Sequence, residues 1–246
     1  MRLAVRAVHG VFNRELSCAT EYWTHRPLES ESRDRSLAAQ YAHLAVSRLT
    51  LPSKDVALLC LSGASGAFLK RFDAACGPGG GLFEQGFSER ARRIHPFTLL
   101  WALQNQVPAA LSIDFALKGP CLNLFESSTG LAHTYPWIQS QFGSGRTVLL
   151  VLCAAGDRDE ERTKVARMRA SEEGLEGAVA IHLSPEPGLG WLSTGHHPVL
   201  SPRPFREPVL AAGEALIEFV TSGISHASCT FADDVGRCLT LNWEAA

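Results

Sequence analysis

The sequence predicts an α/β fold in which a mixed β-sheet is layered with helices. Three short apolar runs, rich in β-branched residues, stand at residues 56–61, 147–154 and 178–183. Runs of this kind are typical of strands that are covered on both faces. Segments with helical spacing lie between them, and this alternation favours a sheet between helices. With 246 residues and 46% hydrophobic content, the chain can form one large domain, residues 1–246.

The other elements of the amino-terminal half can be placed in chain order. We expect a strand over residues 3–12 and then a helix over 36–49, where apolar residues recur at near-helical spacing. Two further helices are expected over 97–107 and 129–142, and a short strand over 113–117 lies between them.

The carboxyl-terminal part is expected to hold one helix and one closing strand. Pro208 stands at the start of a helix that should end at Ser222, with Gly223 just after it, an order common at helix termini. The closing strand is expected over residues 237–243. The proline-rich stretch 184–208 is expected to be an irregular surface segment.

Composition and charge exclude several classes of partner. The formal net charge is -2 and no basic patch is present, so we expect neither nucleic acid nor an anionic membrane as a partner. The chain has no apolar run of about 18 residues and no secretory signal, which predicts a cytoplasmic protein. Its seven cysteines include no Cys-x-x-Cys pair, so neither a disulfide framework nor a metal site is expected.

The segment from residue 93 to residue 130 carries the most information about function. It holds Gln-Asn at 104–105, Gly-Pro at 119–120 and Ser-Ser-Thr-Gly at 127–130. In this order the motifs resemble the N-terminal half of a β-ketoacyl synthase, a condensing enzyme of the thiolase fold. The resemblance is best over residues 56–185. It implies a thiolase-like mixed sheet layered with helices, truncated relative to a full ketosynthase.

The resemblance also places the nucleophile of that family. Ketosynthases carry a cysteine on the turn from a buried strand into a buried helix, and this position falls on Ser128. A serine hydroxyl needs an adjacent general base. The two histidine motifs that supply the base and the oxyanion-side partner in ketosynthases are missing from this sequence. The chain therefore resembles the chain-length-factor proteins, and more closely the short ketoacyl-synthase N-terminal-like proteins of aryl-polyene and type II polyketide systems.

This resemblance implies a heterodimer with an active β-ketoacyl synthase, with acyl carrier protein as a partner of the complex and no cofactor. In ketosynthases, the strand equivalent to residues 122–125 pairs antiparallel with its copy in the partner. The residues just before the turn are expected to shape the partner's acyl tunnel. The residues expected to face the partner or the tunnel are Gln104, Asn105, Leu122, Asn123, Leu124, Phe125, Glu126 and Ser127.

Other interpretations of the same residues stay open. Ser128 also suits the N-cap of the helix that follows it, and Phe125 suits a plain core position. The run Gly-Ala-Ser-Gly-Ala at residues 63–67 is close to a Gly-x-Ser-x-Gly nucleophile elbow. The alternative function is therefore a serine hydrolase or acyltransferase that uses Ser65 or Ser128. In the ketosynthase interpretation, residues 63–66 are only a small-residue turn after a central strand.

Overall fold

The computed structural model describes residues 2–13, 21–22, 35–65, 105–125, 128–155, 176–186, 188–195, 209–232 and 238–246. The helices are α1 (Leu37–Ser47), α5 (Gln106–Asp114), α6 (Leu131–Gly143) and α8 (Ala211–Ser222), and a 3₁₀ turn, η1 (Ser128–Gly130), precedes α6. The strands are β1 (Arg2–Phe12), β2 (Glu21–Tyr22), β3 (Ala57–Ser65), β4 (Cys121–Leu124), β5 (Val148–Ala155), β6 (Gly177–Ser184), β7 (Gly190–Gly195), β8 (His226–Ala232) and β9 (Cys238–Ala245).

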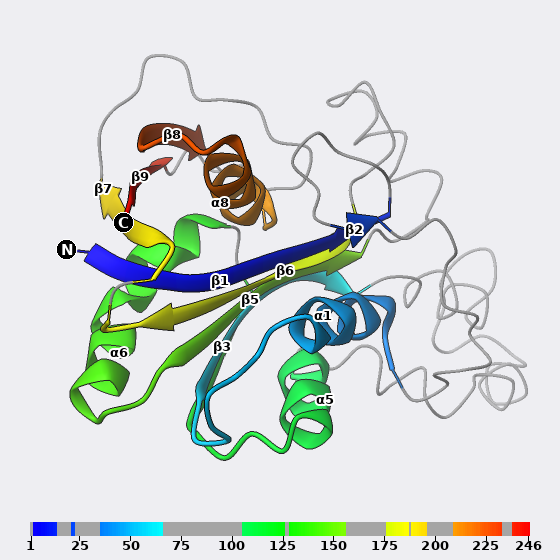
Figure 1. Ribbon diagram of the computed structural model, residues 1–246. Helices are drawn as coiled ribbons and strands as arrows, with labels where there is room; N and C mark the ends of the chain where they lie inside the picture. The colour runs from blue at the N-terminus through cyan, green and yellow to red at the C-terminus, as the bar shows by residue number, and fades with distance from the viewer. Residues whose placement is uncertain are drawn as a thin grey trace, which may run out of the picture.

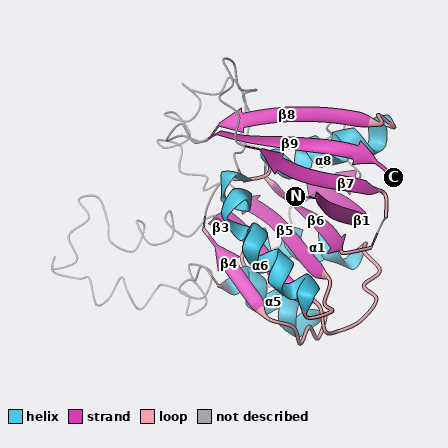
Figure 2. Cartoon of the chain, turned by 90° about the vertical axis from the view of Figure 1, so that its left-hand side faces the viewer, coloured by secondary structure: helices cyan, strands magenta, loops and turns pink. Residues whose placement is uncertain are grey.

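All the strands belong to one mixed sheet, in the order β4-β3-β5-β6-β1-β7-β9-β8, with β2 beside β1 (Figures 1 and 2). The strands β4, β3 and β5 are parallel to one another. From β5 to β8, every neighbouring pair is antiparallel. The parallel strands therefore occupy one end of the sheet, and β4 forms its edge.

Helices cover the parallel end of the sheet on both faces. The alternation along β5 shows this: Val148, Leu150 and Leu152 belong to the core with α6 and α8, whereas Leu149 and Val151 belong to the core with α1 and α5. All eight residues of β5 and all eight of β6 are buried, as expected for strands between two helical layers.

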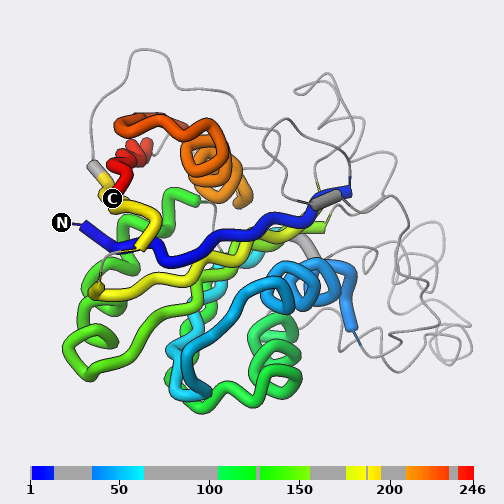
Figure 3. Tube along the Cα trace, in the orientation of Figure 1, coloured from blue at the N-terminus to red at the C-terminus, as the bar shows by residue number. Residues whose placement is uncertain are grey.

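The antiparallel end of the sheet curves around α8 (Figures 1 and 3). Leu192 of β7, Leu241 of β9 and Phe231 of β8 point inward and share one apolar core with Leu216 of α8. Alternate residues on the same strands are polar, such as Ser193, and face away from this core. This period of two indicates strands with one covered face.

The predicted α/β fold and most predicted elements are confirmed. Ser36 caps α1 as expected for a serine at this position, with its hydroxyl accepting a hydrogen bond from the Ala39 amide at 3.3 Å. Gly223 follows α8 with a positive φ of 66°. The confirmed elements, with shifted bounds, are those expected over residues 3–12, 36–49, 56–61, 129–142, 147–154, 178–183, 208–222 and 237–243.

Three predictions were wrong. The strand expected over 113–117 is the end of α5 and the connector after it, because the Phe115 amide donates to the Leu111 carbonyl at 3.0 Å and completes a helical turn. The irregular stretch expected over 184–208 contains β7. The small-residue turn expected at 63–66 is a strand as far as Ser65. Most of the helix expected over 97–107 lies outside the described residues.

Two absences hold for the described part of the chain. None of its helices combines the length and the apolar character that crossing a membrane requires. Of its cysteines, Cys60, Cys121 and Cys153 are free thiols.

Candidate functional site

The strand β4, predicted to face a partner, lies at the edge of the sheet (Figure 2). It is four residues long and pairs in parallel with β3, its one neighbour among the described strands. Cys121 at its start is exposed, and Phe125 just after its end is 56% exposed. Leu122 and Leu124 are half-buried against the core with α6 and α8. An edge strand of this kind presents unpaired backbone groups that another strand can use.

The structure places Asn105 but not all of the other predicted partner-facing residues. Asn105 is exposed and stands at the N-cap of α5, where its side chain makes no capping hydrogen bond. Gln104, Glu126 and Ser127 lie outside the described residues. The partner-facing role of these four residues stays a prediction.

Ser128, at the predicted nucleophile position, is completely buried. Its hydroxyl donates to the Val209 carbonyl at 2.7 Å and accepts from the Ala212 amide at 3.0 Å. Ala212 lies in the first turn of α8, whose amides have no partner within the helix. The hydroxyl thus caps α8, where its hydrogen-bond partner Ala212 follows Ser128 by 84 residues, rather than the helix that directly follows Ser128.

Among the described residues, no group near Ser128 activates its hydroxyl. The starts of α6 and α8 both lie near this residue and provide partial positive charge, which favours an anion. However, the hydroxyl proton is directed at the carbonyl of Val209, which cannot accept it as a base. Of the described histidines, His133 is on α6 but exposed, and no histidine contributes to the hydrogen bonds of Ser128.

A second polar cluster lies on the α1 and α5 face of the parallel strands. The Ser62 hydroxyl donates to Asn123 Oδ1 at 3.1 Å, and Cys153 Sγ lies 3.8 Å from the same hydroxyl. Burial raises the pKa of Cys153 to about 12, while its contact with Ser62 opposes the rise. Burial likewise raises the pKa of Cys60, with smaller contributions from Cys153 and Cys121. Both thiols therefore stay protonated, so this cluster supplies no thiolate nucleophile.

Ser65, the alternative nucleophile, is the last residue of β3. It pairs with Ala155 of β5 after a register irregularity that begins at Ser62. A nucleophile elbow requires the serine on a sharp turn between a strand and a helix. Within the described residues Ser65 still belongs to the strand, and its side chain lies outside what the structure describes.

An open depression of about 480 Å³ lies away from these residues, on the antiparallel end of the sheet. Its lining includes the ion pair between Arg2 and Glu244, whose nitrogen and oxygen are 2.7 Å apart, and the ring of Trp191. None of the predicted site residues lines it. Within the described residues, no group of three side chains could hold a metal ion.

His182 of β6 is a buried imidazole whose Nε2 has no hydrogen-bond partner among the described residues. Burial lowers the pKa of His182 from its ordinary value of 6.5, and the nearby charge of Arg6 lowers it further. In the unfolded chain the imidazole therefore takes up a proton at a higher pH than in the folded protein. Its contribution to stability is complete above pH 6.5 and is lost as the pH falls toward the lowered folded value.

The free energy of unfolding of the wild type should fall between pH 7 and pH 5, a range that spans the ordinary histidine pKa of about 6.5. We expect this decrease to be smaller in His182→Leu, because the variant lacks the imidazole that takes up the proton on unfolding. Urea unfolding at several pH values measures this. The control is His133→Gln, which removes an exposed imidazole and should retain the acid sensitivity of the wild type. Equal acid sensitivity in His182→Leu and the wild type would contradict the assignment.

Comparison with known proteins gives structural relatives only. No protein-family model matches the sequence, and no curated protein matches it. A chain in the complex of the ketosynthase ApeO with its chain length factor ApeC from Xenorhabdus doucetiae matches with a TM-score of 0.63 and 14% identity, over 99% of both chains. The fold is thiolase-like.

Two further solved structures agree. In the complex of a type II polyketide acyl carrier protein with its ketosynthase, AntDE:AntF, the match has a TM-score of 0.67 and 10% identity, over 100% of this chain and 99% of the other. A β-ketoacyl synthase from Burkholderia phymatum matches with a TM-score of 0.55 and 8% identity, over 90% and 86%. The structural similarity to thiolase-like proteins thus covers nearly the whole chain, whereas the sequence resemblance is best over residues 56–185.

Proposed function

We propose that this chain is a non-catalytic, chain-length-factor-like subunit that forms a heterodimer with a β-ketoacyl synthase and shapes its acyl tunnel in polyketide or polyene biosynthesis. Acyl carrier protein binds to the complex and delivers the growing thioester. The observation that carries the proposal is that β4 is an edge strand among the described strands while the serine at the nucleophile position caps a helix.

The edge strand supports the partner role. β4 is short, presents its outer side to no described strand, and is followed by an exposed phenylalanine, Phe125. Edge strands left open invite pairing with another chain, and an exposed aromatic ring beside one is a suitable anchor for an interface. The ring of Phe125 would then limit the length of the acyl chain in the partner's tunnel by steric exclusion.

The capping role of Ser128 supports the non-catalytic role. Its hydroxyl is buried and both of its hydrogen bonds go to backbone groups. Incubation with activated acyl esters, followed by mass spectrometry, should therefore yield no adduct on Ser128 or Ser65. A stable acyl adduct on either serine would favour the alternative of a hydrolase or acyltransferase.

Co-expression tests the partner role directly. The chain and the β-ketoacyl synthase encoded nearest to it should elute from a size-exclusion column as one heterodimeric peak. A chain that remains a monomer beside every ketosynthase encoded near it would contradict the proposal.

Cys121 provides a residue-level test of the same interface. It is exposed at the start of β4, so iodoacetamide should modify it in the isolated chain. Although Cys121 has exposed surface, the surrounding protein partly desolvates its thiol and raises its pKa, so the reaction is best followed at alkaline pH. In the heterodimer we expect its modification to slow by about tenfold or more, because a covered edge strand excludes the reagent. Mapping by mass spectrometry separates Cys121 from Cys238 at the far end of the sheet, which should react equally in both samples.

A further inference from the structure

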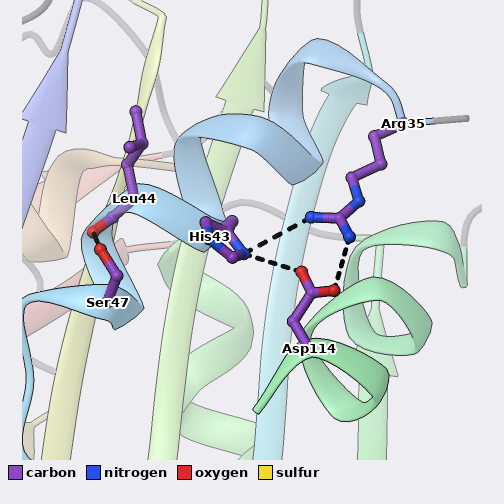
Figure 4. A network of polar contacts seen from close by, with 5 residues as sticks. All are labelled: Arg35, His43, Leu44, Ser47 and Asp114. Atoms are coloured by element: carbon purple, nitrogen blue, oxygen red, sulfur yellow. Dashed lines mark hydrogen bonds and ion pairs between the residues drawn. The ribbon is translucent and has the colours of Figure 1, made fainter. Parts of the chain in front are cut away.

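Three polar side chains link α1 to α5, outside the candidate site (Figure 4). Arg35, two residues before α1, donates from Nη2 to Asp114 Oδ1 at 2.5 Å. The Nδ1 atom of His43 lies 2.7 Å from the other carboxylate oxygen, Oδ2. The Asp114 side chain is only 10% exposed, whereas the side chains of Arg35 and His43 are 27% and 37% exposed. A carboxylate this buried requires such partners.

The geometry also assigns the hydrogen on His43. Arg35 Nη1 is 3.5 Å from His43 Nδ1, but a guanidinium nitrogen can only donate. Since Nδ1 lies much closer to the carboxylate, it carries the hydrogen and donates it to Asp114. This bond forms with a neutral or a charged imidazole, so the link between the helices does not depend on protonation of the ring.

The link continues from Asp114 into the connector between α5 and β4. The ring of His43 packs on the ring of Phe115, with centroids 5.1 Å apart. The Phe115 carbonyl accepts from Lys54 Nζ at 2.9 Å, and the Lys118 amide donates to the Lys54 carbonyl at 2.8 Å. The start and the end of the connector are therefore both fixed by neighbouring segments.

The connector contains a strained residue. Ala116 has a φ of 52°, the only positive value at a non-glycine position in the described part of the chain. A left-handed conformation costs an alanine about 1 kcal/mol, and it persists only where the surrounding contacts determine it. The bond from the Leu117 amide to the Ser112 carbonyl, 2.9 Å long, closes the turn around Ala116. This left-handed turn, common after the last turn of a helix, redirects the chain from α5 toward β4.

We propose that Asp114, held by Arg35 and His43, is a positioning residue that fixes β4 in the place where the partner subunit pairs with it. β4 has four residues and one neighbouring strand among those described, so its backbone hydrogen bonds to β3 stabilise its position only weakly. The connector begins just after Asp114 and leads into β4 at Cys121. This inference rests on the proposed function, because it assigns a purpose to the position of β4.

Hydrogen exchange on the full-length chain tests the positioning without any partner. In Asp114→Asn, which keeps the shape but removes the charge, the amides of residues 121–124 should exchange about tenfold faster, as expected when charge-assisted hydrogen bonds are lost. The amides of β6, in the middle of the sheet, should exchange at the wild-type rate. A uniform increase over both strands, or none in β4, would overturn the inference, since a merely stabilising ion pair acts on the whole fold.

Two sets of variants sharpen this test. His43→Asn keeps an N–H near the position of Nδ1 and should retain slower exchange in β4 than His43→Ala. Glu244→Gln breaks the ion pair with Arg2 near the opposite edge of the sheet and should leave β4 unchanged. Faster exchange of β4 in Glu244→Gln would show that the effect is not local to Asp114.

Binding to the β-ketoacyl synthase encoded nearest to the chain completes the test. Asp114→Asn should bind it about tenfold more weakly than the wild type, at a temperature where both are folded. If β4 exchanges faster but the affinity is unchanged, the positioning role is overturned. If the wild type itself does not bind, the proposed function fails, and the exchange experiment still decides whether Asp114 fixes β4.

Discussion

Gly119→Ala is expected to lower the free energy of unfolding by about 2–3 kcal/mol, a typical cost of forcing a new methyl group into a packed site. A Cβ on this residue would lie 2.3 Å from the Val56 carbonyl oxygen and 2.5 Å from its carbon. These are backbone atoms of the residue just before β3, so no side-chain rotation relieves the clash. Urea unfolding with an unchanged m-value measures the loss.

The variant should also weaken the proposed heterodimer with a β-ketoacyl synthase, because the same residue leads the chain into β4. The Leu58 amide of β3 donates to the Pro120 carbonyl at 2.9 Å, and moving Gly119 away from Val56 displaces that bond. Gly143→Ala is the matched control. No atom lies within 4 Å of a Cβ at Gly143, at the end of α6, so we expect no loss of stability there. A Gly119→Ala protein within about 0.5 kcal/mol of the wild type would contradict the close approach.

The central strands could be predicted from sequence because burial on both faces makes them continuous apolar runs, as in β5 and β6. The one-sided strands gave a weaker signal. In β8, the buried Cys229 and Phe231 alternate with Ser228 and Thr230, which face away from the core. This period of two is hard to recognise in the sequence because the strand has only 7 residues. The spacing of Ile113, Phe115 and Leu117 imitated a strand, because apolar residues two apart also occur where a helix ends and a connector begins.

The elements that carry the candidate site could be predicted only where neighbours in sequence form them, and the roles of its residues stay predictions. The Gly-Pro motif and the residues of β4 are local, and the structure places them together at the sheet edge. The partners of Ser128 are not local: Val209 and Ala212 follow it by 81 and 84 residues. Arg35 and Asp114 are 79 residues apart. Contacts at such separations depend on the packing of the whole chain, and no short pattern encodes them.

Ser128→Ala is expected to destabilise the protein by about 2–3 kcal/mol, because it removes the hydrogen bonds that a buried carbonyl and a buried amide make with the hydroxyl. The carbonyl belongs to Val209 and the amide to Ala212, and the loss of the amide's partner also uncaps α8. Thermal or urea unfolding measures the change. Ser144→Ala is the matched control: its hydroxyl also donates to a backbone carbonyl, that of Gln141 at 2.8 Å, but Ser144 is exposed and water can replace the bond.

The same variant separates a structural serine from a reactive one. On the proposed function, Ser128→Ala should still join the ketosynthase below its unfolding temperature and leave the length distribution of the acyl products unchanged, since a capping hydroxyl would take no part in the reaction. A nucleophile would give the opposite result: near wild-type stability, and loss of acyl transfer. Stability and product length together therefore decide whether the hydroxyl serves the fold, because the one proton of this buried hydroxyl is already donated to a backbone carbonyl.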